Sequence, residues 1–154
     1  MKFSQSTESA IDSLLYMAAH PEVKDFYVED VARVQHISAS YLSKVFQQLV
    51  KAGVMRSHRG SKGGYALAKE PKEITLLDIA QVIEGTSPMY ECNAGMKSCT
   101  LTTRCLILST FRDAEKAMQD VLRKVTLASL LENMKGHAHE ASWVGLNEKV
   151  AAAQ

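Results

Sequence analysis

The sequence predicts a mainly α-helical protein that contains one small β-hairpin. Three features predict this class. Apolar residues recur at intervals of three and four through residues 10–50, a glycine-rich tip separates two short β-like segments near residue 60, and a second apolar periodicity runs from residue 107 to 125. Intervals of three and four place apolar side chains on one face of a helix, whereas two short extended segments around glycines form a hairpin.

The composition fits a folded protein of modest size. The chain has 154 residues, of which 46% are hydrophobic, so it is long enough for one compact domain with an appended element. No apolar run approaches the length of a membrane span, and the amino terminus shows no apolar signal region. We therefore expect a cytoplasmic protein with no membrane association.

The charges are segregated along the chain, although the net charge is only +1. Residues 31–69 contain no Asp or Glu and carry a charge of +7, which leaves −6 for the rest. The positive residues are Arg33, Lys44, Lys51, Arg56, Arg59, Lys62 and Lys69. A basic block in an otherwise acidic chain predicts contact with a polyanion on one face. The alternative is a solvated basic surface without a partner.

Three short helices are predicted in the first third of the chain. Ser6 or Thr7 caps the first helix, the second covers residues 28–34, and the third begins at Ser38 or Ser40 and stops before Gly53. A tight connection of three to four residues joins the second helix to the third. Two short helices joined in this way form a helix-turn-helix.

The exposed face of the third helix carries hydrogen-bonding and cationic side chains without a carboxylate. Serine and glutamine bond base edges or phosphates, and lysine neutralises phosphate. We therefore predict that this face reads the major groove of double-stranded DNA, although an ordinary polar helix face is the alternative. The predicted contacts are Ser38, Ser40, Tyr41, Ser43, Lys44 and Gln47.

The hairpin follows the helix-turn-helix directly. Its β-like segments, 54–58 and 65–68, flank a cationic, glycine-rich tip. Glycines allow close backbone approach, and cations beside them clamp minor-groove phosphates. The order of elements predicts the wing of a winged helix-turn-helix domain, and a generic glycine turn is the alternative. The predicted DNA contacts of this wing are Arg59, Gly60, Lys62, Gly63 and Gly64.

Two further helices and a long one complete the chain. Thr75 caps a helix that runs to Glu84, with Asp78 as its capping-box partner and Gly85 as its stop. A long helix from about residue 104 carries a single narrow apolar seam, and a short helix restarts at Thr126.

A long helix with one narrow seam has no partner left in its own chain, so we predict a homodimer formed through it. The alternative is that the helix lies back on its own domain. The seam consists of Ile107, Phe111, Ala114, Met118, Val121 and Val125.

All three cysteines lie between the wing and the long helix. Cys92, Cys99 and Cys105 stand seven and six residues apart, in a segment rich in glycine, serine and threonine. Three soft thiolates suit an iron–sulfur cluster or zinc, and either centre needs a fourth ligand from elsewhere. The alternative is three free thiols.

Together these features resemble the IscR, NsrR and RirA (Rrf-type) family of bacterial regulators over about residues 1–133. The resemblance rests on the order of the helix-turn-helix, the wing tip at 59–65, the helix start at 73–79 and the cysteine triplet. It implies a homodimeric winged-helix transcription regulator, usually a repressor and not an enzyme. An iron–sulfur cluster on Cys92, Cys99 and Cys105, with 4Fe–4S favoured over 2Fe–2S, would tune binding to a palindromic operator in response to nitric oxide, redox state or iron availability.

The fourth ligand departs from part of this family. Leu108 occupies the position of the histidine ligand of IscR-type members. NsrR-type members supply a carboxylate from the partner subunit at the position of Glu8. The alternative for Glu8 is a helix amino-terminal charge favoured by the helix dipole. Ser43 stands where many IscR-like proteins have glutamate, so their operator sequence does not transfer.

The expected organisation has four parts: a DNA-binding domain at 1–85, a cysteine-containing cluster loop at 86–106, a dimerisation helix with a short following helix at 107–134, and a flexible tail at 135–154. The cluster state would set the spacing of the two DNA-reading helices. One rival is a zinc- or thiol-redox-sensing regulator on the same scaffold. A second, weaker rival is an electron carrier or enzyme that carries the cluster.

Overall fold

The structure, a computed structural model, describes residues 2–58, 64–92, 105–135 and 144. It confirms the mainly helical class, with an antiparallel two-stranded hairpin in the described part of the chain. The elements are α1 (Gln5–Ala19), α2 (Val28–Val34), α3 (Ala39–Lys51), β1 (Met55–His58), β2 (Gly64–Leu67), the 3-10 helix η1 (Pro71–Glu73), α4 (Leu76–Glu84), α5 (Leu106–Arg123) and α6 (Leu127–Lys135).

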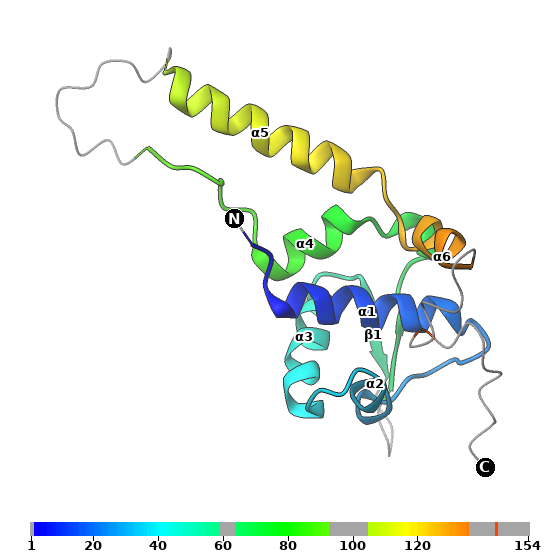
Figure 1. The fold of residues 1–154 in the computed structure, drawn as a ribbon. Coiled ribbons are helices and arrows are strands. Elements are labelled where there is room, and N and C mark those ends of the chain that lie inside the picture. The colour runs from blue at the N-terminus through cyan, green and yellow to red at the C-terminus, as the bar shows by residue number, and fades with distance from the viewer. Residues whose placement is uncertain (1, 59–63, 93–104, 136–143, 145–154) are drawn as a thin grey trace.

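Helix α1 runs through the middle of the molecule and packs against α3, α4 and α6 (Figure 1). Its apolar stripe supplies Leu14, which is fully buried together with Phe46 of α3 and Ile79 of α4. The predicted cap at Ser6 or Thr7 is wrong, because the helix begins at Gln5 and its N-cap residue is Ser4. The Thr7 hydroxyl instead donates a hydrogen bond to a carboxylate of α4, which no local pattern reveals.

The helix-turn-helix formed by α2 and α3 is confirmed. His36 turns the chain between them with a φ of 54°, a left-handed conformation in which histidine is enriched. Ser38 caps α3, because its side-chain oxygen accepts a hydrogen bond from the Tyr41 N–H at 3.2 Å. Gly53 takes a φ of 71° just after α3, as predicted for the end of that helix.

The hairpin pairs Met55 with Leu67 at one end and His58 with Gly64 at the other. The connection between α1 and α2 also joins it, since Phe26 and Tyr65 exchange both backbone hydrogen bonds, at 2.8 and 2.9 Å. These bonds attach the tip end of the hairpin, where Tyr65 pairs with Ser57, to the segment that leads into α2.

Helix α4 begins with the predicted capping box. Thr75 Oγ1 accepts a hydrogen bond from the Asp78 N–H, and the Asp78 carboxylate accepts one from the Thr75 N–H. Gly85 ends the helix with a φ of 85°. The amino-terminal end of α4 is bonded to the junction after α5, because the Leu76 N–H donates to the Val125 carbonyl at 2.9 Å.

Helix α5 projects from the rest of the molecule and packs along α4 (Figure 1). None of its residues is buried. The predicted seam is split by this arrangement. Met118 is half-buried and lines a cavity beside α4, whereas Ile107, Ala114 and Val121 are exposed. Val125 lies beyond the end of the helix, so it does not continue the seam.

The carboxy-terminal segment expected to be flexible, residues 135–154, lies outside the described residues except for two positions. Lys135 ends α6, and Val144 is fully buried. The carbonyl of Val144 lies 3.1 Å from His20 Nε2. No helix in the described residues is long and apolar enough to cross a membrane.

Asp12 on α1 is a half-buried carboxyl group whose pKa is raised to about 6, first by burial and then by repulsion from Glu8. The folded protein therefore binds this proton more tightly than the unfolded chain, whose Asp pKa is near 3.8. The resulting stability is present below the unfolded pKa and is lost as pH rises through about 6.

Asp12→Asn should therefore stabilise the metal-free protein at pH 8, because it removes a half-buried charge. After allowance for solvent screening we expect a gain of about 1 kcal/mol, or roughly 3 °C in melting temperature. The gain should shrink when thermal unfolding is measured at pH 5, where Asp12 holds its proton. The exposed control Asp113→Asn should change the melting temperature little, because it removes no buried charge. A gain from Asp12→Asn that is equal at both pH values would contradict this account.

Candidate functional site

The polar face of α3 is exposed as the sequence predicted. Its apolar side consists of Leu42, Val45, Phe46 and Leu49, which are buried in the core. Packing that side into the core turns Ser40, Lys44 and Gln47 outward, and all three are exposed. Ser38 is also exposed, and Ser43 is half-buried. The outward face of α3 thus offers hydroxyl, amide and ammonium groups without a carboxylate.

Tyr41 differs from the other predicted contacts on α3. It is half-buried and packs against the core. Its hydroxyl shares a hydrogen bond with Ser6 Oγ of α1 at 3.0 Å. The side chain therefore joins α3 to α1, and its contact with DNA stays a prediction.

Most of the predicted wing tip, namely Arg59, Gly60, Lys62 and Gly63, lies outside the described residues. Gly64 begins β2 and is buried. A side chain at Gly64 would bring its Cβ within 2.9 Å of the Asp25 Cβ. This glycine is therefore required by packing within the chain, which is a different reason from the close DNA approach that the sequence suggested.

The two cysteines that the structure describes flank the segment of residues 93–104. Cys92 is exposed and follows the extended segment after α4, whereas Cys105 is half-buried and is the N-cap residue of α5. Both are free thiols. Cys99 lies outside the described residues. Leu108, at the position of the IscR-type histidine, is a half-buried residue in the first turn of α5.

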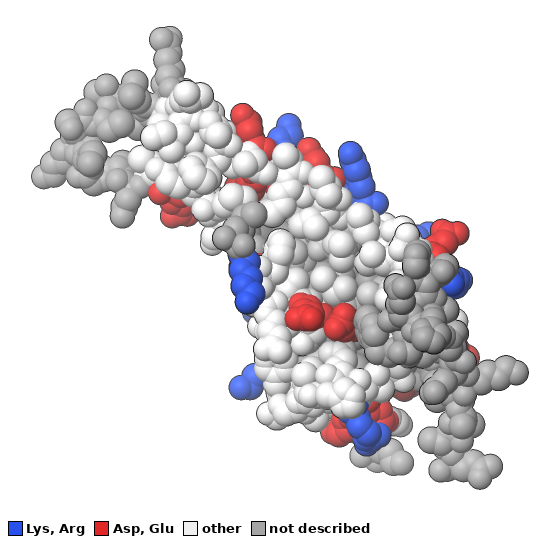
Figure 2. Space-filling view, in the orientation of Figure 1, with Lys and Arg blue, Asp and Glu red and all other residues white. Residues whose placement is uncertain are grey.

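Glu8 is exposed in the first turn of α1. Figure 2 shows acidic side chains over this part of α1, and the acidic residues of the helix are Glu8 and Asp12. Within the described residues, no group of three or more His, Cys, Asp or Glu side chains is placed to hold a metal ion. Glu8 therefore does not join Cys92 and Cys105 in one chain, so a shared centre would require Glu8 of the partner subunit.

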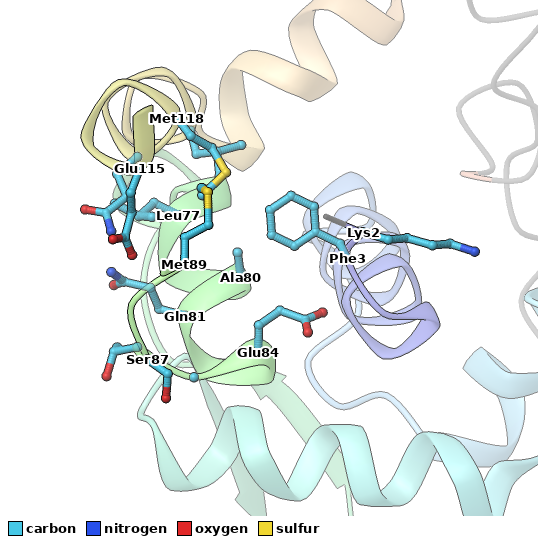
Figure 3. A pocket seen from close by; sticks show the side chains of 14 residues that line it. Lys2, Phe3, Leu77, Ala80, Gln81, Glu84, Ser87, Met89, Glu115 and Met118 are labelled. Carbon is cyan, nitrogen blue, oxygen red and sulfur yellow. The ribbon is translucent and has the colours of Figure 1, made fainter. Parts of the chain in front are cut away.

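A cavity of about 220 Å³ lies between the amino terminus, α4 and α5. Figure 3 shows Phe3 extending toward it from the amino-terminal segment and Glu84 from α4, with Met89 and Met118 also on its wall. Sequence reasoning missed this cavity, because its walls come from three separate segments of the chain.

Glu84 was also missed as a key residue. Its Oε1 atom accepts hydrogen bonds from the Ser4 N–H and the Ser4 hydroxyl, each at 2.7 Å, and from the Thr7 hydroxyl. The bonds from Thr7 and Ser4 hold the pKa of Glu84 below its ordinary value. Because these bonds link residues 77 and 80 positions apart, no sequence signal identifies them.

Helix α5 carries four of the seven large apolar side chains that are exposed in the described residues. Leu106, Ile107, Phe111 and Val121 are between 40 and 78% exposed. In Figure 2, acidic and basic side chains alternate along the edge of the molecule formed by α5. The helix is therefore amphipathic, with charged positions beside an uncovered apolar stripe.

The chain is similar in sequence and in fold to known proteins. The chain is 32% identical over 134 residues to the HTH-type transcriptional regulator NsrR of Shouchella clausii. The matched region covers 86% of this chain and 90% of that protein. The solved structure of T. potens IscR is similar with a TM-score of 0.68 and 28% identity, over 92% of this chain and 90% of that one. The oxidized form of Staphylococcus aureus CymR has a TM-score of 0.63 and 30% identity, over 86 and 97% of the two chains.

The family model that matches is Rrf2, described as an iron-dependent transcriptional regulator, and the match covers residues 3–133. That range contains the helix-turn-helix, the hairpin, all three cysteines and α5. These relatives are transcriptional regulators rather than enzymes. The chain is therefore a member of the Rrf2 family of winged-helix transcriptional regulators.

Proposed function

We propose that this protein is a cytoplasmic, homodimeric repressor that binds a palindromic DNA operator and whose affinity is controlled by an iron–sulfur cluster. The signal would be nitric oxide, redox state or iron supply. The single observation that carries the DNA-binding part is the outward face of α3, where exposed Ser40, Lys44 and Gln47 stand on the second helix of a helix-turn-helix. That helix is the one that enters the major groove in this motif.

The donor set fits a cluster. Cysteine thiolates are the usual ligands of iron–sulfur centres. Cys92 is exposed and Cys105 is half-buried, so neither is sealed in the core. Cys99 of the same chain and Glu8 of the partner subunit complete the proposed ligand set. A ligand other than cysteine suits a sensor. When bound, the cluster would supply a centre that reacts with nitric oxide or oxygen. The resemblance favours 4Fe–4S over 2Fe–2S.

The described contacts offer a route between the cysteines and the DNA-reading helix. The segment that ends at Cys92 continues directly from α4. Helix α4 packs against α3, and it is also bonded to the start of α1 through Glu84. We infer that a change in the position of Cys92 would reach α3 through residues 85–91 and then through α4, which packs against α3.

The homodimer is supported by the surface of α5. Ile107 is 58% exposed and Val121 is 63% exposed, with Ala114 between them on the same face. These three positions are seven residues apart, which is the repeat of a helix–helix seam. A second copy of α5 would cover this stripe and leave the α4 contact intact, since Met118 and Leu122 face the cavity beside α4.

A second candidate function is thiol-redox sensing on the same scaffold. The similarity to an oxidized form of CymR favours this candidate. Cys92 and Cys105 are free thiols in the described structure. Metal analysis after strictly anaerobic isolation separates the two functions, because a redox switch requires no iron.

The DNA-binding proposal predicts that Lys44→Ala weakens operator binding by about 10-fold at moderate salt, because one phosphate or base contact is lost in each subunit. If Lys44 contacts phosphate, the slope of log affinity against log salt should fall by about 1 for each lysine. Gel shifts over a salt series measure both effects. Lys116→Ala, on an exposed part of α5, is the control and should leave affinity unchanged. Equal affinity of wild type and Lys44→Ala would refute this role.

The cluster proposal predicts that anaerobically purified protein has visible absorption and iron, and that Cys92→Ser and Cys105→Ser lose both, because each removes a thiolate ligand. Mössbauer spectra of the wild type would assign the cluster, and gel shifts of cluster-loaded and cluster-free protein should differ. Ser109→Ala, in the first turn of α5, is the control and should keep its colour. A colourless wild type with stoichiometric zinc, or equal DNA affinity with and without the cluster, would contradict the proposal.

The dimer proposal predicts that Val121→Glu dissociates the protein, because a carboxylate would be buried at the α5–α5 contact without a partner. We expect the dimer to weaken by at least about 100-fold, as measured by sedimentation equilibrium. The control Lys116→Glu alters charge on the same helix and should remain dimeric. A dimeric Val121→Glu protein would show that another surface forms the contact.

A further inference from the structure

Two aromatic rings stack immediately beside the described cysteines. The rings of Tyr90 and Phe111 lie 4.5 Å apart between centroids and are nearly parallel, at 15°. Tyr90 precedes Cys92 by two residues, and Phe111 follows Cys105 by six. Phe111 belongs to the predicted dimer seam, whereas Tyr90 lies outside every predicted site. The stack gives both residues a contact within the chain.

The segment after α4 runs back along α5 toward the amino-terminal end of that helix. Ser87 and Met89 line the same cavity as Glu115 and Met118, and Tyr90 then meets Phe111, one to two turns nearer the start of α5. Figure 1 shows this segment heading for the end of α5 at which Leu106 stands. The segment therefore brings Cys92 toward the amino-terminal end of α5, where Cys105 is the N-cap residue.

The stack limits how far the two cysteines can separate. Thirteen residues of unconstrained chain span up to about 45 Å. With the rings in contact, Cys92 lies within about 7 Å of Tyr90 along the chain. Cys105 lies about 9 Å from Phe111 along the helix axis. A shorter range of separations raises the effective concentration of one thiol at the other.

The rings do not serve mainly to build the core. Tyr90 is half-buried and Phe111 is 40% exposed. Neither belongs to the cluster of buried residues around α1 or to the partly buried residues packed against it. Their removal should therefore affect the cysteine end of α5 more than the stability of the domain.

We propose that the Tyr90–Phe111 stack is a clasp that positions Cys92 and Cys105 to act on one centre. Both are positioning residues, because they act through the cysteines and contact no metal themselves. The link to a cluster rests on the proposed function. The positioning of the two thiols does not, so the two ideas can fail separately.

The test measures the rate at which Cys92 and Cys105 form a disulfide in the absence of metal. In a Cys99→Ser background, the metal-free reduced protein is treated with diamide, which takes up the two hydrogens as Cys92 and Cys105 form a disulfide. Tyr90→Ala and Phe111→Ala should slow this closure by about 2- to 10-fold, the factor by which losing one aromatic stack shifts a two-state equilibrium. Tyr90→Phe keeps the ring and should close at the wild-type rate.

Leu122→Ala is the matched control. Leu122 lines the cavity at the other end of the α4–α5 contact, so its truncation should lower the melting temperature without slowing disulfide closure. Equal closure rates in wild type and Tyr90→Ala would overturn the clasp. Slow closure in Tyr90→Phe or in Leu122→Ala would also overturn it, because ring stacking would then not be the cause.

A second measurement tests the link to the metal centre. With all three cysteines present and the cluster loaded, Tyr90→Ala should lose visible absorption to a chelator about 2- to 10-fold faster than wild type. An unchanged rate would overturn the link to the cluster. Wild-type protein that acquires no cluster would defeat the proposed function, yet the closure assay would still decide whether the clasp exists.

Discussion

The packing of α4 against α1 and α3 is the interaction on which the rest of the molecule depends. Ile79 of α4 is fully buried in the core that contains Leu14 of α1 and Phe46 of α3. The two ends of α4 have different tasks. The amino-terminal end is bonded to the junction between α5 and α6, and the carboxy-terminal end holds the start of α1 through Glu84. The cysteine segment then leaves from that second end. Helix α4, followed by residues 85–91, thus connects the DNA-reading half of the chain to the cysteine-bearing half.

Helix α5 poses a physical problem that a second subunit would solve. An isolated helix of 18 residues is marginally stable in water, and most helical stability in proteins comes from packing an apolar face. In the described structure α5 packs on α4 along one side, while Ile107, Ala114 and Val121 remain exposed on the other. A helix with two apolar sides can hold its own domain and a partner at once. Phe111 of the clasp lies between Ile107 and Ala114 along the helix, so the clasp borders the proposed dimer contact.

Helix α3 carries no carboxyl group, whereas α1 carries two. Residues 31–69 contain no Asp or Glu, so α3 presents cations and hydrogen-bonding groups without competing negative charge. The half-buried Asp12 and exposed Glu8 lie on α1 instead, where Glu8 raises the pKa of Asp12. Glu8 and Asp12 nevertheless lie near the helix-turn-helix, because they line one pocket with residues 34–37. The absence of carboxylates is therefore a property of α3 itself.

The sequence by itself determined the features that depend on neighbours a few residues apart. Apolar spacing located the helices, and the capping box of Thr75 with Asp78 located the start of α4. The cysteine spacing and the wing tip identified the family, which the family match confirms. The predicted ligand set and the DNA contacts remain predictions, since Cys99 and most of the wing tip lie outside the described residues.

Only the tertiary structure decided the contacts between distant segments. It assigned the start of α1 to Ser4, because Glu84, 80 residues away, binds that turn. It turned Tyr41 toward Ser6, and it divided the apolar seam of α5 between α4 and solvent. It also stacked Tyr90 on Phe111. A local pattern fixes which face of a helix is apolar, but how the chain packs fixes which surface that face meets, and this is why these contacts could not be read from the sequence.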